Sequence, residues 1–154
     1  MPIRAASHIA IGVHDMERSL HFYRDLLGLR VDVERLEPNQ AVAEPPAPRR
    51  RAVYLRWADG PQATFVVLDQ QLPEAKGEPL ALFRVGVHHV GFWVDDLEAM
   101  YARLVAAGVP VEIPLVRTAD TKAYGEVSGD SFMTAFFRDP DGTIVQLDQR
   151  VHAG

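Results

Sequence analysis

The sequence contains no cysteine, and this absence removes several classes of chemistry at once. Disulfide scaffolds, zinc–cysteine sites, iron–sulfur clusters and thiol nucleophiles all need the sulfur atom, and none of the 154 residues supplies it. Any metal site in this chain must therefore use His, Asp, Glu, Gln or backbone oxygen as ligands.

Long apolar runs and an excess of basic charge are also missing. No window approaches the ~18 uninterrupted apolar residues of a membrane-spanning helix, and the first residues lack the long apolar stretch of a signal peptide. We therefore expect a cytoplasmic protein without a membrane partner. The formal net charge of −5 offers no electrostatic footprint for a polyanion, so we expect no nucleic-acid partner. The one basic run, Arg49 to Arg51, is expected in a solvated loop.

What the sequence does contain is an internal repeat. The run HIAIGVHD from His8 matches HVGFWVDD from His89 with an offset of 81 residues, and each apolar run predicts a short buried strand. Apolar residues at helical spacing follow each run and predict two amphipathic α-helices of about three turns. Asp15 and Asp95 stand at the expected N-cap positions.

Further strand-like runs follow each helix, separated at the end by the turns Asp59-Gly60 and Asp141-Gly142. The runs are 29–33, 52–57 and 64–68 in the first half, and 109–113, 133–138 and 143–147 in the second. They predict an α+β fold of two βαβββ modules. The modules span 6–70 and 85–150, the linker 71–84, and two loops 37–51 and 114–130. Because ~75 residues would not bury a comfortable core, we expect one domain over 1–154 with a pocket between or within curved sheets.

The element order, the paired openings HIAIGV and HVGFWV, and the ending FFRDPDGTIVQL carry a family resemblance. Over about residues 6–149 the chain resembles the glyoxalase/bleomycin-resistance/extradiol-dioxygenase superfamily, also called the vicinal oxygen chelate fold. The resemblance implies curved mixed sheets around a pocket. It does not select a reaction, because this scaffold hosts isomerases, lyases, epimerases, dioxygenases, thiol transferases and non-enzymatic drug binders.

The resemblance also implies a set of metal-ligand positions, at the opening of the first strand and in the last strand of each module. Here these positions are His8, Val67, His89 and Gln146. We expect His8, His89 and Gln146 to hold a divalent metal ion (Fe, Mn, Ni, Co or Zn) with open positions for substrate. The alternative for each histidine is a structural, hydrogen-bonded role. Val67, which has no ligating atom, is expected at the substrate site.

Gln146 departs from the commoner family pattern, which has glutamate at this position. The amide removes one negative charge, which should weaken metal binding and raise Lewis acidity, and it cannot accept a proton as a general base. Asp69 and Asp148 lie two residues further on, hence on the same strand faces. Each is either a base near the site or a solvated strand end, and the second interpretation is favoured. His88 should point away from the face of His89.

Three further residues are candidates for the pocket. Tyr124 and Glu126 belong to a polar, glycine-containing segment where this fold places residues that cover substrate, with a surface turn as the alternative. Asp148 joins them as a catalytic candidate. Trp57, Tyr124 and Asp69 are candidates for substrate binding.

Two functions from different classes follow. One is a metal-dependent lyase, isomerase or dioxygenase acting on a small oxygenated molecule. The other is a metal-free drug- or antibiotic-binding protein of the bleomycin-resistance type, which the net charge of −5 and the missing carboxylate ligand favour. A homodimer is expected because similar proteins often complete their pockets by pairing modules.

Overall fold

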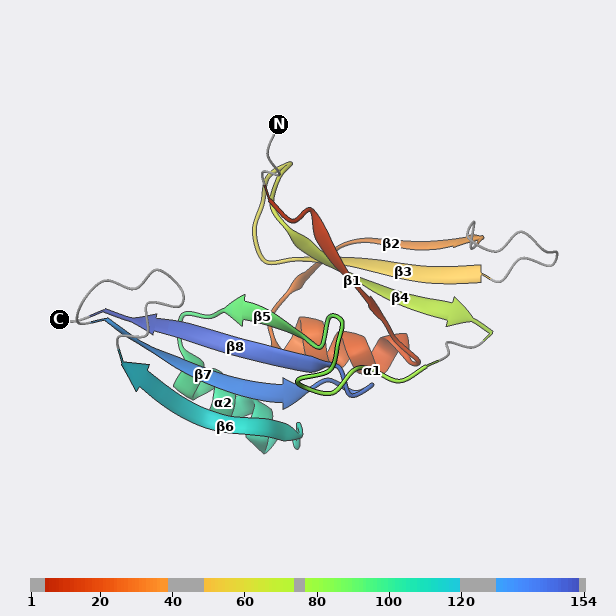
Figure 1. The fold of residues 1–154 in the computed structure, drawn as a ribbon. Coiled ribbons are helices and arrows are strands. Elements are labelled where there is room, and N and C mark those ends of the chain that lie inside the picture. Colours follow the sequence, from red (N-terminus) through yellow and green to blue (C-terminus); the bar gives the residue numbers. More distant parts are fainter. Residues whose placement is uncertain (1–4, 39–48, 74–76, 120–129, 153–154) are drawn as a thin grey trace. The chain divides into compact units, whose positions relative to one another are not determined.

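The structure, a computed structural model, describes residues 5–38, 49–73, 77–119 and 130–152. The chain divides into two compact units, Met1–Gly77 and Glu78–Gly154. We refer to them as the first and second units, and each contains one four-stranded sheet and one helical segment (Figure 1). No helix in the described ranges is long and apolar enough to cross a membrane.

The first unit runs strand, helix and three strands. Its elements are β1 (His8–Gly12), α1 (Met16–Leu20) continued by the π-helix η1 (His21–Leu26), β2 (Arg30–Pro38), β3 (Arg49–Arg56) and β4 (Phe65–Leu72). The sheet order is β1-β4-β3-β2. β1 lies parallel to β4, whereas the two other pairings are antiparallel.

The second unit repeats this arrangement. Its elements are β5 (His89–Trp93), α2 (Leu97–Ala106), β6 (Val111–Ala119), β7 (Ser131–Arg138) and β8 (Ile144–Val151). The sheet order is β5-β8-β7-β6, again with one parallel pair, β5 and β8. The predicted α+β fold of two βαβββ modules is therefore confirmed.

The strand registers establish which positions of the two units correspond. His8 pairs with Phe65 and Ala10 with Val67 in the first sheet. In the second, His89 pairs with Ile144 and Gly91 with Gln146. Val67 and Gln146 therefore occupy equivalent positions, although the offset between them is two residues smaller than between the histidines. The turn between Arg138 and Ile144 is three residues shorter than the turn between Arg56 and Phe65, and it contributes the largest part of this difference.

The basic run Arg49 to Arg51 is not a solvated loop, as the sequence analysis expected, but the start of β3. Arg50 Nε lies 2.8 Å from Asp69 Oδ1, and Arg51 contacts Glu34 at 2.7 Å and Glu17 at 2.8 Å. Carboxylates on β2, β4 and α1 thus compensate the positive charges and let these residues enter the sheet. The loops expected over 37–51 and 114–130 are shortened by strand at their ends, because β2 reaches Pro38 and β6 reaches Ala119.

The first helix differs from the regular α-helix that its spacing predicts. After five α-helical residues it widens into a π-helix, in which Leu27 N–H donates to Phe22 C=O at 3.0 Å. The interval from Met16 to Gly28 is one residue longer than the equivalent interval from Leu97 to Gly108. A π-helical turn takes up one extra residue without moving the flanking elements, so both helices end at equivalent glycines.

The N-cap predictions are right for one helix and wrong by one residue for the other. Asp15 accepts hydrogen bonds from the backbone N–H groups of Glu17 and Arg18. At the second helix the cap is Asp96, which accepts from Ala99 N–H at 2.9 Å, and not Asp95. The cap must precede the first helical residue, and α2 begins at Leu97.

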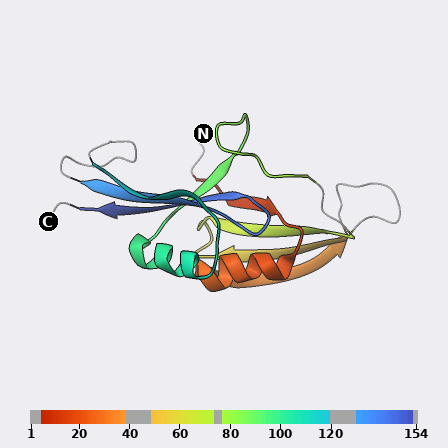
Figure 2. The same ribbon diagram turned by 90° about the horizontal axis from the view of Figure 1, so that it is seen from below.

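Each helix covers one face of the sheet of its own unit (Figure 2). In the second unit, Tyr101 of α2 contacts the ring of Phe137 with centroids 5.4 Å apart, and Leu97 N–H donates to Gln149 Oε1 at 2.7 Å. Because strand side chains alternate between faces, the residues between these on β7 and β8 occupy the opposite face. That second face holds the candidate site.

Candidate functional site

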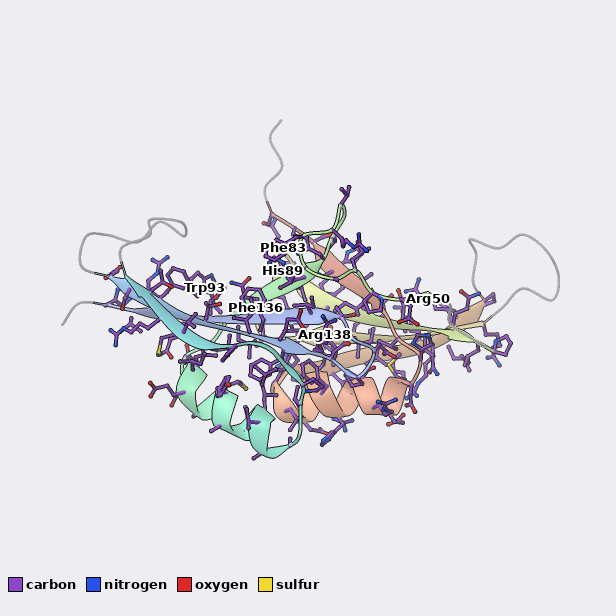
Figure 3. The ribbon with its side chains drawn as sticks, turned by 60° about the horizontal axis from the view of Figure 1, so that its bottom comes forward. Arg50, Phe83, His89, Trp93, Phe136 and Arg138 are labelled. Atoms are coloured by element: carbon purple, nitrogen blue, oxygen red, sulfur yellow. The ribbon has the colours of Figure 1, made fainter. Side chains whose placement is uncertain are left out.

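The face of the second sheet that points away from α2 brings together polar and aromatic residues from three strands. Their positions follow from the registers, in which Gly91 pairs with Gln146, Trp93 with Asp148, Phe136 with Gln146 and Thr134 with Asp148. His89 lies two residues before Gly91 and shares its face. Figure 3 shows His89, Phe136 and Trp93 on this side of the sheet.

His89 reaches inward across the sheet. Its ring contacts that of Phe136 with centroids 5.7 Å apart and planes at 62°. Since β8 separates β5 from β7, the two rings meet above β8, next to Gln146. His89 is thus held beside the amide predicted to ligate with it.

His88 does not point away from His89, as the sequence analysis expected. Its Nδ1 lies 2.8 Å from Nδ1 of His89, and the two rings are 4.7 Å apart. His88 precedes the first residue of β5, so strand alternation does not apply to it. Only one of the two nitrogens can carry the shared hydrogen, and in the tautomer in which His89 Nδ1 donates it, Nε2 of His89 keeps its lone pair for a ligand.

The surroundings of His89 favour its neutral form. Burial lowers the pKa of this imidazole, the neighbouring His88 lowers it further, and Asp148 acts in the opposite direction. A neutral imidazole is the form that binds metal ions.

Gln146 and Asp148 form a buried polar pair on β8, with exposed fractions of 7% and 5%. The Gln146 amide nitrogen donates to both Asp148 oxygens, at 2.9 and 3.1 Å, and to Thr134 Oγ1 at 3.2 Å. The expectation that Asp148 is a solvated strand end is therefore wrong. β8 continues to Val151, so Asp148 lies inside the strand, with β5 and β7 on its two sides.

The equivalent face of the first sheet carries His8, Val67 and Asp69. His8 is exposed, stacks on Phe65 at 5.4 Å between ring centroids, and has Ser7 Oγ 3.0 Å from its Nδ1. Val67 is 3% exposed and, being a hydrocarbon side chain, cannot bind a metal. Of the two ligand positions that the resemblance implies in this unit, His8 is therefore the one whose side chain can bind a metal.

Asp69 differs from Asp148 in having a cation beside it. Arg50 Nε lies 2.8 Å from its Oδ1, although their relative angle does not make a hydrogen bond. Burial is the largest influence on the Asp69 carboxyl and raises its pKa, while Arg50 opposes that change. Asp69 is half-buried and not the solvated strand end that was expected.

The sequence-predicted residues therefore fall into four groups. The second unit brings His89, Gln146 and Asp148 to one face, and the first unit provides His8, Val67 and Asp69. Trp57 lies just after β3 and is 49% exposed. Tyr124 and Glu126 lie outside the described residues. In the described ranges, no three His, Cys, Asp or Glu side chains form a metal-binding group.

Sequence reasoning missed Gly91, Thr134 and Arg150. Thr134 helps to orient the Gln146 amide, and the Arg150 guanidinium carbon lies 5.5 Å from the centre of the Trp93 ring. Arg150 follows Gln146 and Asp148 at a spacing of two, which was a usable signal. Nothing in the sequence indicated Thr134, because its place beside Gln146 depends on the pairing of β7 with β8.

Comparisons with known proteins agree with this architecture. A protein of Haemophilus influenzae named lactoylglutathione lyase is 29% identical over 140 residues, which cover 91% of this chain and 88% of that protein. An ethylmalonyl-CoA/methylmalonyl-CoA epimerase of Cereibacter sphaeroides is 26% identical over 148 residues, covering 93% and 96%.

Among solved structures, a glyoxalase family protein from Bacillus cereus superposes with a TM-score of 0.75 at 13% identity, covering 98% of this chain and 97% of the other. This match shows the shared fold. The family pattern of the Glyoxalase/Bleomycin resistance protein/Dioxygenase superfamily matches residues 5–147. The chain belongs to this superfamily.

Proposed function

We propose that this protein is a divalent-metal-dependent lyase or isomerase that acts on a small oxygenated acyl compound. The observation that carries the proposal is the face of the second sheet, where His89 and the buried pair Gln146 and Asp148 lie together. His8, His89 and Gln146 are the proposed ligands. Two imidazole nitrogens and one amide oxygen suit Fe, Mn, Ni, Co or Zn ions.

The fit of a cation to this site rests on Asp148. The carboxylate is 5% exposed, and the partner recorded for it among the described residues is the neutral Gln146 amide. A buried carboxylate without a counter-ion is unfavourable, and a metal ion near Gln146 would supply the missing positive charge.

The relatives' names favour lyase or isomerase chemistry over oxygenation. Lactoylglutathione and methylmalonyl-CoA are both thioesters with a C–H bond next to the thioester carbonyl, and both names describe a lyase or an epimerase. The metal would act as a Lewis acid on the carbonyl oxygen and so acidify this C–H bond. A dioxygenase would lack the carboxylate of the usual two-histidine, one-carboxylate triad.

The proposed roles of the protein's own residues are binding and orientation. Phe136 and His88 hold the His89 ring, and Thr134 and Asp148 hold the Gln146 amide. Tyr124, Glu126 and Asp148 remain the catalytic candidates. Val67, Asp69, Trp57 and Tyr124 remain the candidates for substrate binding.

Hydrogen exchange at the acidified carbon tests this function. Chelator-treated protein is reloaded separately with Ni²⁺, Co²⁺, Zn²⁺, Mn²⁺ or Fe²⁺ and incubated in D₂O with lactoylglutathione or methylmalonyl-CoA. We expect deuterium next to the thioester carbonyl of at least one compound, measured by mass spectrometry. His89→Ala and chelator should abolish it. Exchange that is equal with and without metal would overturn the proposal.

A second function, metal-free binding of an aromatic compound, is favoured by two observations. Two of the four family ligand positions carry the uncharged Val67 and Gln146, and the Trp93 ring is 54% exposed on the site face. A thermal-shift screen with planar aromatic compounds, run with and without chelator, separates the functions. Stabilisation that chelator does not change supports this one.

We also propose a homodimer, on the expectation that modules of two chains share pockets. Light scattering measures the mass directly, and a monomeric mass at all concentrations would contradict this proposal.

A further inference from the structure

Asp69 on β4 and Asp148 on β8 occupy equivalent positions, but they differ in whether a positive charge lies beside the carboxylate. In the first sheet Val67 is followed two residues later by Asp69, which has Arg50 at 2.8 Å. In the second sheet Gln146 is followed two residues later by Asp148. No ion pair with Asp148 exists within the described ranges, and its recorded partner is the Gln146 amide nitrogen. Among the described residues, the carboxylate of the first pair therefore has a cation beside it and the carboxylate of the second pair has none.

The hydrogen bonds of the Gln146 amide determine which of its atoms can coordinate a cation. Its Nε2 donates to Asp148 Oδ1 at 2.9 Å, to Asp148 Oδ2 at 3.1 Å and to Thr134 Oγ1 at 3.2 Å. The reversed amide would bring its oxygen against a carboxylate, and two acceptors repel. Asp148 thus orients the amide so that the carbonyl oxygen, the ligating atom, lies on the side away from the carboxylate.

Gly91 places the backbone of β5, without a side chain, beside this pair. It is the residue of β5 paired with Gln146, and a Cβ built on it would lie 3.9 Å from Asp148 Oδ2 and 4.0 Å from Gln146 Cβ. Any larger residue would therefore cover the pair from the β5 side. His89 and Trp93 lie on either side of Gly91 along the same strand face.

We propose that Gln146 and Asp148 act as one unit toward a divalent cation, in which Gln146 supplies the ligating oxygen and Asp148 the negative charge. The inference rests on the proposed metal-dependent function and specifies how this chain keeps a metal without a carboxylate at position 146. In this chain the negative charge is at position 148 instead of position 146, and the buried Asp148 carboxylate that carries it also orients the proposed ligand Gln146.

The pairing has a consequence for substitutions at either position. Gln146→Glu alone would place a second carboxylate where the amide now lies about 3 Å from Asp148, and two buried like charges repel. Asp148→Asn alone would remove the charge and release the amide. The double variant Gln146→Glu/Asp148→Asn exchanges the two groups and keeps one negative charge.

Calorimetric titration of chelator-treated protein with Zn²⁺ alone and with Ni²⁺ alone tests the inference. Asp148→Asn should bind the ion roughly 10–100-fold more weakly than the wild type, the usual effect of losing a residue that orients a ligand. The metal-free Gln146→Glu variant should unfold at a lower temperature, and the double variant should recover both the unfolding temperature and the metal affinity. Circular dichroism establishes that each variant is folded.

The matched control is Asp69→Asn, the same substitution at the equivalent position of the first sheet, which should change the affinity much less. Wild-type protein that binds neither ion would overturn the proposed metal-dependent function itself. Wild-type protein that binds, together with an Asp148→Asn variant of equal affinity, would overturn the Gln146–Asp148 pair alone.

Discussion

Three aspartate side chains of this structure lie in different environments, and the environment of each determines what the carboxylate does. Asp148 is buried against an amide, Asp69 is half-buried against an arginine, and Asp139 is 3% exposed and bound to backbone N–H groups. The same residue type thus serves a candidate site, a sheet and a turn. Its surroundings decide its role.

Asp139 explains the Asp-Pro-Asp-Gly sequence between β7 and β8. Its Oδ1 accepts from Asp141 N–H at 3.0 Å and Thr143 N–H at 2.8 Å, while Gly142 takes a φ of 93°, which favours glycine. Asp139→Ala would leave these N–H groups without their acceptor and should lower the free energy of unfolding by about 1–3 kcal/mol. Urea denaturation measures the change. Asp59→Ala, in the exposed turn of the first unit, should change it by less than about 0.5 kcal/mol.

Asp69 predicts a dependence of stability on pH. Burial raises the pKa of this carboxyl in the folded protein above its ordinary value of 3.8, so the folded state holds the proton more strongly than the unfolded state. Stability contributed by Asp69 is then greatest below pH 3.8 and falls as the pH rises through the folded-state pKa.

The measurement is the difference in unfolding free energy between wild type and Asp69→Asn over this acidic range. We expect the wild type to lose stability relative to the variant as the pH rises. A difference with the opposite slope would show that Arg50, which lowers the pKa, outweighs burial.

At the scale of elements, the two units share their ion pairs and sheet irregularities, although small insertions and deletions distinguish their sequences. Arg56 and Arg138 stand at equivalent places and pair with Asp32 and Glu112, each at 2.7 Å. Both carboxylates lie at register shifts, between β2 and β3 and between β6 and β7. The irregularities of one sheet are thus matched in the other, and the clearest difference is the π-helical turn η1.

Deletion of Asp25 tests whether η1 is π-helical because the first helix contains one residue more than α2. Asp25 is exposed and contacts its neighbours Arg24 and His21, so its removal should convert η1 to α-helix. The free energy of unfolding should change by less than about 1 kcal/mol, and hydrogen exchange should show the α-helical pattern of bonds. Deletion of Ala106 from α2 is the control, because α2 is a regular α-helix without an extra residue. It should be much more destabilising, and equal effects of the two deletions would contradict the idea.

At the scale of the whole molecule, the proposed ligands are divided between the units, with His8 in the first and His89 and Gln146 in the second. A metal bound by all three would therefore take its ligands from both units.

This division predicts how metal affects unfolding. With free metal at ~100 times its dissociation constant, the folded state gains about 2.7 kcal/mol, which corresponds to a rise of roughly 5–10 °C in the unfolding temperature. Scanning calorimetry of chelated and reloaded protein measures it. His8→Ala and His89→Ala should each remove most of the gain, whereas His21→Ala, an exposed helix residue, should keep it. A full gain in His8→Ala would place the site in the second unit alone.

Much of the fold could be predicted because its signals are local. Strand alternation, helical spacing and the repeat are properties of neighbouring residues, and they identified both βαβββ modules. The predicted strands were too short where charged residues enter the sheet. Arg50 and Arg51 are partnered by Asp69, Glu34 and Glu17 from other elements, and no local pattern reveals such partners.

The candidate site divides in the same way. The sequence by itself determined the repeat, the equivalence of His8 with His89 and the presence of an amide at position 146, because each follows from residues read in order. Only the tertiary structure decided that Asp148 is buried, that His88 contacts His89 and that Thr134 holds Gln146. Burial and cross-strand pairing depend on residues distant in the sequence, and they turn a spacing of two along β8 into a buried, hydrogen-bonded amide and carboxylate.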